Sequence, residues 1–206
     1  ESVSYSFVVT PSNCNFTYHY AVVLDDGGHP ATEQPYFQIR MTDGNGNPID
    51  CATYDVDAST APSIGGFTVV GDIYYKPWTS VFIPLNNYMG QNVTIQFVTR
   101  DCFSSGGSHF CYAYLDATCS PLEIISSSPT VCGGQNVTLS APIGAATYAW
   151  TGPGLTPPTN TQVATITLAG SYTVTMTTFG NVPCTFTLDT IIPGSPGNPI
   201  ANFSAT

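Results

Sequence analysis

Residues 93–116 read VTIQFVTRDCFSSGGSHFCYAYLD, and this stretch decides the fold. Val93, Ile95 and Phe97 alternate with residues of the opposite face, which is the period of two expected of a half-buried strand. The second arm repeats the alternation at Tyr112 and Tyr114. The two arms predict a β-hairpin with a Gly-Gly loop. Its tip gathers side chains that can do chemistry: Asp101, Cys102, His109 and Cys111.

The composition favours two β-rich domains. At 206 residues the chain is long enough for one large domain or two ordinary ones. All but two of the 13 acidic residues lie at or before Asp116, and the remainder is dominated by Thr, Ser, Pro and Gly. Charged residues make up only 8% of the chain, and strand-forming Thr, Val, Tyr and Phe are frequent. The sequence therefore predicts an all-β protein.

The formal net charge of −10 excludes some partners. An acidic chain without a basic run is repelled by phosphate backbones, so no nucleic-acid binding is expected. No apolar run approaches the ~18 residues of a membrane span, so no membrane insertion is expected either. Seven cysteines beside only three basic residues indicate an oxidising compartment. We therefore expect an extracellular or cell-surface protein.

Several spaced motifs in residues 3–120 resemble one known family. They are FTYHYAVVLDDGGHP at 16–30, KPWTSVFIPLNNYMG at 76–90 and GGSHFCYAYLD at 106–116. Together they are similar to a recurrent domain of giant Bacteroidetes surface proteins of the gliding-motility and adhesin type, which the type IX route exports. The resemblance implies a jelly-roll-like β-sandwich over residues 1–120. Cys111 departs from the family pattern, which has Gly there, and Cys14 is an additional cysteine.

Residues 121–193 predict a second sandwich. Six short strand-like segments are separated by turn residues at the even spacing of an immunoglobulin-like domain. The stretches AATYAWTGPG and LAGSYTVTMT resemble the Ig-like and PKD-like repeats of the same giant proteins, with Trp150 as a core residue and Tyr172 as a corner tyrosine. Residues 194–206 are expected to be a linker and the start of a following repeat. The chain is thus expected to be a piece of a longer tandem-repeat protein.

The cysteines predict disulfides. Cys132 and Cys184 are the only cysteines of the second part, so they are expected to pair with each other and close a loop of a small domain. In the first part, Cys102 and Cys111 flank the predicted tip, but Cys51 is also able to reach Cys102. The favoured pairs there are Cys51 with Cys102 and Cys14 with Cys111. Cys119 is then left free or pairs outside this chain.

Acidic residues at predicted strand ends suggest a Ca²⁺ site. Carboxylates and loop carbonyls supply the oxygen ligands that calcium requires. Jelly-roll-like modules often hold such an ion, and the resemblance implies that Asp116 is one ligand, with Asp101 and Asp25 as further candidates. The alternative is that these are solvated turn residues, or that Asp101 pairs with Arg100 or Arg40.

His29, Glu33 and His109 form another candidate group, because both histidines follow Gly-Gly segments whose loops are able to converge. A zinc or catalytic site would need three convergent ligands, or a base beside a nucleophile, and the chain has neither H-E-x-x-H nor C-x₂-C spacing. The simpler expectation is that the histidines bond to loop backbone and that the cysteines hold no metal.

Two further features concern glycans. Eight aromatic residues are able to fill the core or to stack against sugar rings, and core burial is the commoner outcome. They are Tyr18, Tyr20, Tyr36, Tyr74, Tyr75, Trp78, Tyr112 and Tyr114. Thr190, within Asp-Thr-Ile, fits a short pattern on which Bacteroidetes attach O-glycans.

These observations predict a non-enzymatic structural or adhesive module of a tandem-repeat surface protein, because no nucleophile, base and orienting group stand together in the sequence. Its expected partners are neighbouring repeats, identical subunits joined into a filament by strand addition, or surface glycans. The alternative is a carbohydrate-binding module of a secreted multidomain enzyme.

Overall fold

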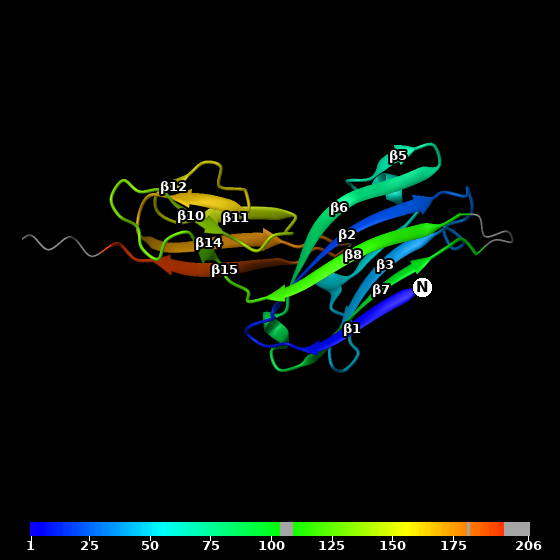
Figure 1. Cartoon of the computed structure of the whole chain (residues 1–206), viewed down its shortest axis with the longest axis horizontal. Helices are drawn as coiled ribbons and strands as arrows, with labels where there is room; N and C mark the ends of the chain where they lie inside the picture. Colours follow the sequence, from blue (N-terminus) through cyan, green and yellow to red (C-terminus); the bar gives the residue numbers. More distant parts are fainter. Residues whose placement is uncertain (104–108, 181, 196–206) are drawn as a thin grey trace, which may run out of the picture. The chain divides into compact units, whose positions relative to one another are not determined.

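Nearly all of the regular secondary structure of the protein is β-strand (Figure 1). The computed structural model describes residues 1–103, 109–180 and 182–195. The chain divides into two compact units. The first comprises Glu1–Glu123 with the segments Pro142–Thr147 and Met176–Phe186, and the second comprises Ile124–Ala141, Tyr148–Thr175 and the described residues from Thr187 onward. The predicted all-β class is confirmed.

The first unit is a sandwich of two four-stranded sheets with the orders β1-β7-β3-β4 and β5-β6-β2-β8 (Figure 1). Most neighbouring strands are distant in sequence, as expected of a jelly-roll-like sandwich. The strands are β1 (Ser2–Val8), β2 (Asn15–Asp25), β3 (Tyr36–Thr42), β4 (Tyr54–Asp57), β5 (Thr68–Val70), β6 (Ile73–Pro84), β7 (Asn92–Arg100) and β8 (Cys111–Ser120). Short 3₁₀ turns occur at Asp50–Ala52, Ala61–Ser63 and Asn86–Tyr88.

Aromatic rings from the inner faces of both sheets form the core of this unit. On β2, Tyr18 and Tyr20 are buried, whereas His19 between them is partly exposed. The Tyr20 ring stacks on Phe37 of β3 with centroids 5.4 Å apart, and Tyr18 meets Phe97 of β7 edge-on at 5.6 Å. Such pairs stabilise beyond the area that they bury. Two of the eight aromatic candidates are therefore core residues.

The predicted hairpin of residues 93–116 is wrong, although both of its strands exist. β7 pairs with β1 and β3, whereas β8 pairs with β2 in the opposite sheet. The two strands therefore belong to different sheets. The predicted Gly-Gly tip at residues 106–107 lies outside the described residues. Alternation predicts which face of a strand is buried, but it does not select the neighbouring strand.

The disulfide of the described chain joins Cys51 to Cys184. This corrects the predicted pair of Cys184 with Cys132, because Cys184 belongs to the first unit and Cys132, which is exposed, to the second. It equally replaces the predicted pair of Cys51 with Cys102.

The predicted pair of Cys14 with Cys111 is also wrong. Cys14 directly precedes β2, whereas Cys111 pairs in register with Leu24 near the far end of that strand. Ten strand residues separate the two positions by roughly 33 Å. Cys14 and Cys111 are both buried free thiols, and Cys119 is free and exposed.

The second unit also contains two sheets, with the orders β12-β13-β10-β9 and β11-β14-β15. Trp150 is buried, as predicted, and its indole N–H donates to the Thr161 carbonyl oxygen at 2.9 Å. The strands are β9 (Ile125–Ser126), β10 (Val137–Ser140), β11 (Thr147–Thr151), β12 (Leu155–Thr156), β13 (Val163–Ile166), β14 (Gly170–Thr177) and β15 (Thr185–Ile192).

Tyr172 of β14 is fully buried, and its hydroxyl lies within hydrogen-bonding distance of the carbonyl oxygens of Pro153, at 2.8 Å, and Leu168. This is the backbone-anchoring role predicted for a corner tyrosine.

Gly194, predicted to begin a linker, instead forms a parallel bridge with Val131. Residues 196–206, the rest of the predicted linker and start of a following repeat, lie outside the described residues.

Candidate functional site

The outer face of the β5-β6-β2-β8 sheet carries exposed tyrosines. Along β8, Cys111 and Ala113 face the core, so Tyr112 and Tyr114 point outward and are 58% and 61% exposed. Val23 of β2 pairs with Tyr112 on one side and with Tyr75 of β6 on the other. Residues in one row across a sheet share a face. Tyr75, Tyr112 and Tyr114 therefore form one surface, here named the tyrosine platform.

Polar groups lie further along the same face. His19 of β2 pairs with Ser80 of β6 and with Asp116 of β8, and its Nδ1 lies 2.7 Å from the Ser80 hydroxyl oxygen. This row stands two positions beyond Ala21, the residue that pairs with Tyr114. Ring faces and hydrogen-bonding groups thus occupy one continuous surface. Trp78, which is 61% exposed, belongs to the same sheet where the pairing of β2 with β6 becomes irregular.

A groove of ≈ 460 Å³ lies between β1 and β8, the edge strands of the two sheets. Val3 and Tyr5 line it from β1, Phe97 from β7, and Leu115 from β8. Among the described strands, β1 pairs only with β7 and β8 only with β2, so each presents an unpaired edge. Exposed edges beside an apolar surface are sites where another strand can add.

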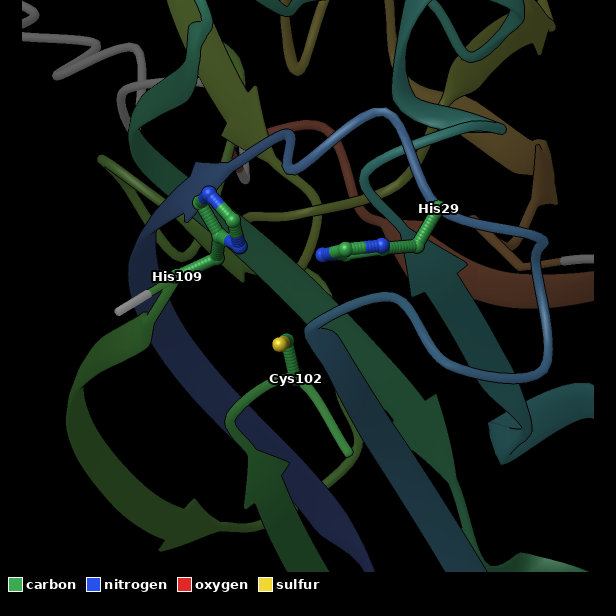
Figure 2. Close-up of side chains that lie close together, drawn as sticks. All are labelled: His29, Cys102 and His109. Atoms are coloured by element: carbon green, nitrogen blue, oxygen red, sulfur yellow. The ribbon is translucent and has the colours of Figure 1, made fainter. Parts of the chain in front are cut away.

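His29 and His109 converge, as the sequence suggested they could. The two rings lie 5.1 Å apart, and the third potential ligand is Cys102 rather than Glu33. Figure 2 shows His29 extending toward His109, with Cys102 beside both. Within the described residues, this trio is the group of His, Cys, Asp and Glu side chains that brings three potential ligand atoms within 4.8 Å of one another. Glu33 takes part through its backbone, because its carbonyl oxygen accepts the Phe103 N–H at 3.1 Å.

The three carboxylates predicted to bind calcium are not brought together. Asp101 accepts the Cys111 N–H at 3.0 Å, and Asp25 lies at the end of β2 near the same place. Asp116 stands five residues farther along β8 than Cys111, roughly 17 Å away. Calcium thus stays a prediction from composition, without a shared ligand set among the described residues.

A buried polar cluster lies inside the first unit. The Lys76 ammonium donates to the Gly65 carbonyl oxygen at 2.8 Å and lies 5.4–6.0 Å from the ring centroids of Phe67, Tyr54 and Tyr20. Burial lowers the pKa of Lys76 and raises the pKa of Tyr20 and Tyr54. The cation is therefore held by ring faces and a backbone carbonyl.

Thr190, the predicted glycosylation site, lies within β15, where it is partly buried between exposed Asp189 and exposed Ile191. Asp189 accepts a hydrogen bond from the Thr173 hydroxyl. Modification of Thr190 stays a prediction.

The part of the chain that the structure describes contains no helix with the length and apolar character of a membrane span.

Sequence reasoning missed two features of these surfaces. Cys102 was assigned to a disulfide, and only its separation of seven residues from His109 could have pointed to a shared site. The tyrosine platform was hidden among eight equivalent aromatic candidates, because pairing register decides which of them share an exposed face. No protein-family model matches the chain, and no curated protein matches it.

Proposed function

We propose that the chain is a non-enzymatic extracellular module with a structural and adhesive role in a tandem-repeat bacterial surface protein, and that the tyrosine platform is its adhesive surface. The observation that carries the proposal is the row of Tyr75, Val23 and Tyr112, in which one exposed ring lies on each side of an aliphatic residue. A monomeric domain has no structural need to expose such rings together.

Surface glycans are the partners that this chemistry fits. The C–H face of a sugar ring packs on an aromatic ring, while its hydroxyls take hydrogen bonds from neighbouring polar groups. His19, Ser80 and Asp116 supply such groups on the same face. The low content of charged side chains also suits a neutral ligand rather than an ionic one. A disulfide is compatible with the expected oxidising compartment.

Glycan-array binding by the purified chain tests the proposal. We expect a subset of glycans to bind, and the double substitution of Tyr112→Ala with Tyr114→Ala to weaken that binding at least about 10-fold, or about 1.4 kcal/mol. Tyr5→Ala removes an exposed tyrosine from β1, outside the platform, and serves as the matched control. Binding that is absent, or unchanged in the double variant, would contradict the adhesive role.

A carbohydrate-binding module of a secreted enzyme would use the same surface. The sequence surrounding this chain in its gene separates the two possibilities. Tandem repeats beside it support an adhesin, and an adjoining hydrolase domain supports the enzyme-linked module.

Self-assembly is a second candidate function, and the groove between β1 and β8 favours it. The occupant proposed is a β-strand from a second copy, because both edges offer unpaired backbone groups beside an apolar floor. Sedimentation and electron microscopy of the isolated chain test this. Tyr5→Lys places a charge in the groove and is expected to block assembly, whereas Tyr114→Lys on the outer face is not. A chain that stays monomeric at high concentration would exclude filament formation.

A further inference from the structure

We propose that His29, Cys102 and His109 form a zinc-binding site at one end of the first sandwich, independent of the adhesive surface. His29 comes from the connection between β2 and β3, Cys102 directly follows β7, and His109 directly precedes β8. Three parts of the chain therefore supply one ligand each, and their ligand atoms lie within 4.8 Å of one another (Figure 2).

The donor set fits zinc. Zn²⁺ binds imidazole nitrogen and thiolate sulfur, and three protein ligands leave a fourth position for water. Around a tetrahedral ion the donor atoms would stand roughly 3.3–3.6 Å apart, given Zn–N and Zn–S bond lengths. A closure of about 1 Å from the observed spacing is within reach of rotation about the side-chain bonds. Calcium and magnesium do not suit this set, because both require oxygen ligands.

An unsatisfied polar atom supplies independent support. His109 Nδ1 is buried and has no hydrogen-bond partner among the described residues. Leaving a buried acceptor or donor unpaired costs about 1–3 kcal/mol. If Nδ1 of His109 binds the metal ion, this cost is removed directly. If the other ring nitrogen, Nε2, binds it, the ring is fixed in an orientation in which Nδ1 can find a hydrogen-bond partner.

Gly27 is fitted to the two rings. A Cβ atom at this position would lie 2.3 Å from His109 Nδ1 and 2.5 Å from His29 Cδ2, so any larger residue would collide with both histidines. Gly28 then has a φ of +65°, which glycine adopts without strain. The Gly-Gly segment thereby lets the His29 connection approach His109 closely.

Hydrogen bonds hold the three segments together. The Cys102 N–H donates to the His109 carbonyl oxygen at 3.1 Å, and the Asp25 N–H donates to the Phe110 carbonyl oxygen at 3.0 Å. Gln34 is almost fully buried, and its side-chain amide donates to the His29 carbonyl oxygen at 2.9 Å. A bound ion would add coordinate bonds between the strand ends, which these hydrogen bonds already hold close to one another.

Cobalt titration tests the site, because Co²⁺ occupies zinc sites and reports thiolate ligation by a charge-transfer absorption. The whole chain is first freed of metal with a chelator, and Co²⁺ is then added, followed by Zn²⁺. We expect one cobalt per chain, a thiolate charge-transfer band and full displacement by zinc. Zinc should also raise the melting temperature of the wild-type chain.

Cys102→Ser and His29→Ala should each weaken cobalt binding at least about 10-fold and abolish or shift the band. The matched controls are Cys132→Ser, an exposed cysteine of the second unit, and His19→Ala, a histidine bonded to Ser80. Circular dichroism verifies that each variant folds. Absence of the band in the wild-type chain, or a band that Cys102→Ser and His29→Ala leave unchanged, would overturn the proposed zinc site. Neither result bears on the proposed glycan binding, which the Tyr112 and Tyr114 variants test separately.

Discussion

Cys51 and Cys184 lie 133 positions apart in the sequence, yet a disulfide joins them with their Cα atoms 5.4 Å apart. A link that closes so long a loop restricts the unfolded chain strongly. Cys51 belongs to the 3₁₀ turn Asp50–Ala52, and Cys184 belongs to the segment Met176–Phe186 that the first unit includes. The pair thus ties a late segment of the chain into the first unit.

Replacing this pair by Cys51→Ser with Cys184→Ser is expected to lower the free energy of unfolding by about 2–5 kcal/mol. Denaturant unfolding measures the loss. Cys132→Ser, at an exposed free cysteine, should leave stability unchanged. Non-reducing peptide mapping provides a separate check, and recovery of a peptide that links Cys132 to Cys184 would contradict the observed pairing.

Alkaline pH is expected to destabilise the fold. Burial raises the pKa of Tyr18, Tyr20 and Tyr54 above the ordinary value of ~10. Above pH ~10 the unfolded chain loses these protons while the folded chain keeps them, so the free energy of unfolding falls as pH rises. In that range each such tyrosine lowers the free energy of unfolding by about 1.4 kcal/mol per pH unit.

Urea unfolding between pH 8 and pH 11 measures this loss, and ultraviolet absorbance follows tyrosine ionisation. Burial lowers the pKa of Lys76, which acts in the opposite direction: its share of stability grows with pH up to its unfolded pKa of ~10.4. One lysine does not outweigh three tyrosines. A stability that stays level to pH 11, with all tyrosines titrating normally, would show that these rings reach solvent in the folded state.

The Cys111 thiol is expected to resist alkylation in the folded protein. Burial and the nearby Asp101 carboxylate raise the pKa of Cys111 to about 12, so the reactive thiolate is scarce at pH 8. Cys132 is exposed and should react first. Mass spectrometry after timed iodoacetamide treatment compares the two sites. Equal rates before denaturation would mean that β8 opens readily at Cys111.

Tyr172→Phe is expected to destabilise the second unit by about 1–3 kcal/mol, because it removes a buried hydroxyl that bonds to the Pro153 and Leu168 carbonyl oxygens. Tyr114→Phe removes a hydroxyl from the exposed platform and should change stability by less than about 0.5 kcal/mol. Thermal unfolding of both variants tests the difference. Equal effects would argue against an anchoring role for the Tyr172 hydroxyl.

Sequence patterns predicted the strands better than their partners. The alternation of Val93, Ile95 and Phe97 placed these residues in the core, as observed. It could not reveal that β7 and β8 belong to opposite sheets, because alternation describes one strand and pairing depends on the whole sandwich. Burial of Trp150 and Tyr172 was predictable, because the stretches around them resemble those of Ig-like repeats, in which these positions are core and corner residues.

The candidate sites show the same limit. The two Gly-Gly segments suggested that His29 and His109 could meet, and they do. Cys102 was not recognised as the third member, because metal-binding spacing is usually read within one loop and these ligands come from three segments. The cysteine pairing failed for a related reason: Cys184 belongs spatially to the unit that precedes it in the chain.

The Cys51–Cys184 link also determines how the chain would respond to tension. If a pulling force were applied before Cys51 and after Cys184, the load would pass through the sulfur atoms and bypass the intervening loop. The chain between the two cysteines, which are 133 positions apart and would span roughly 450 Å when extended, would then not be released. β4 through β14 would be shielded from stretching for as long as the bond stays oxidised.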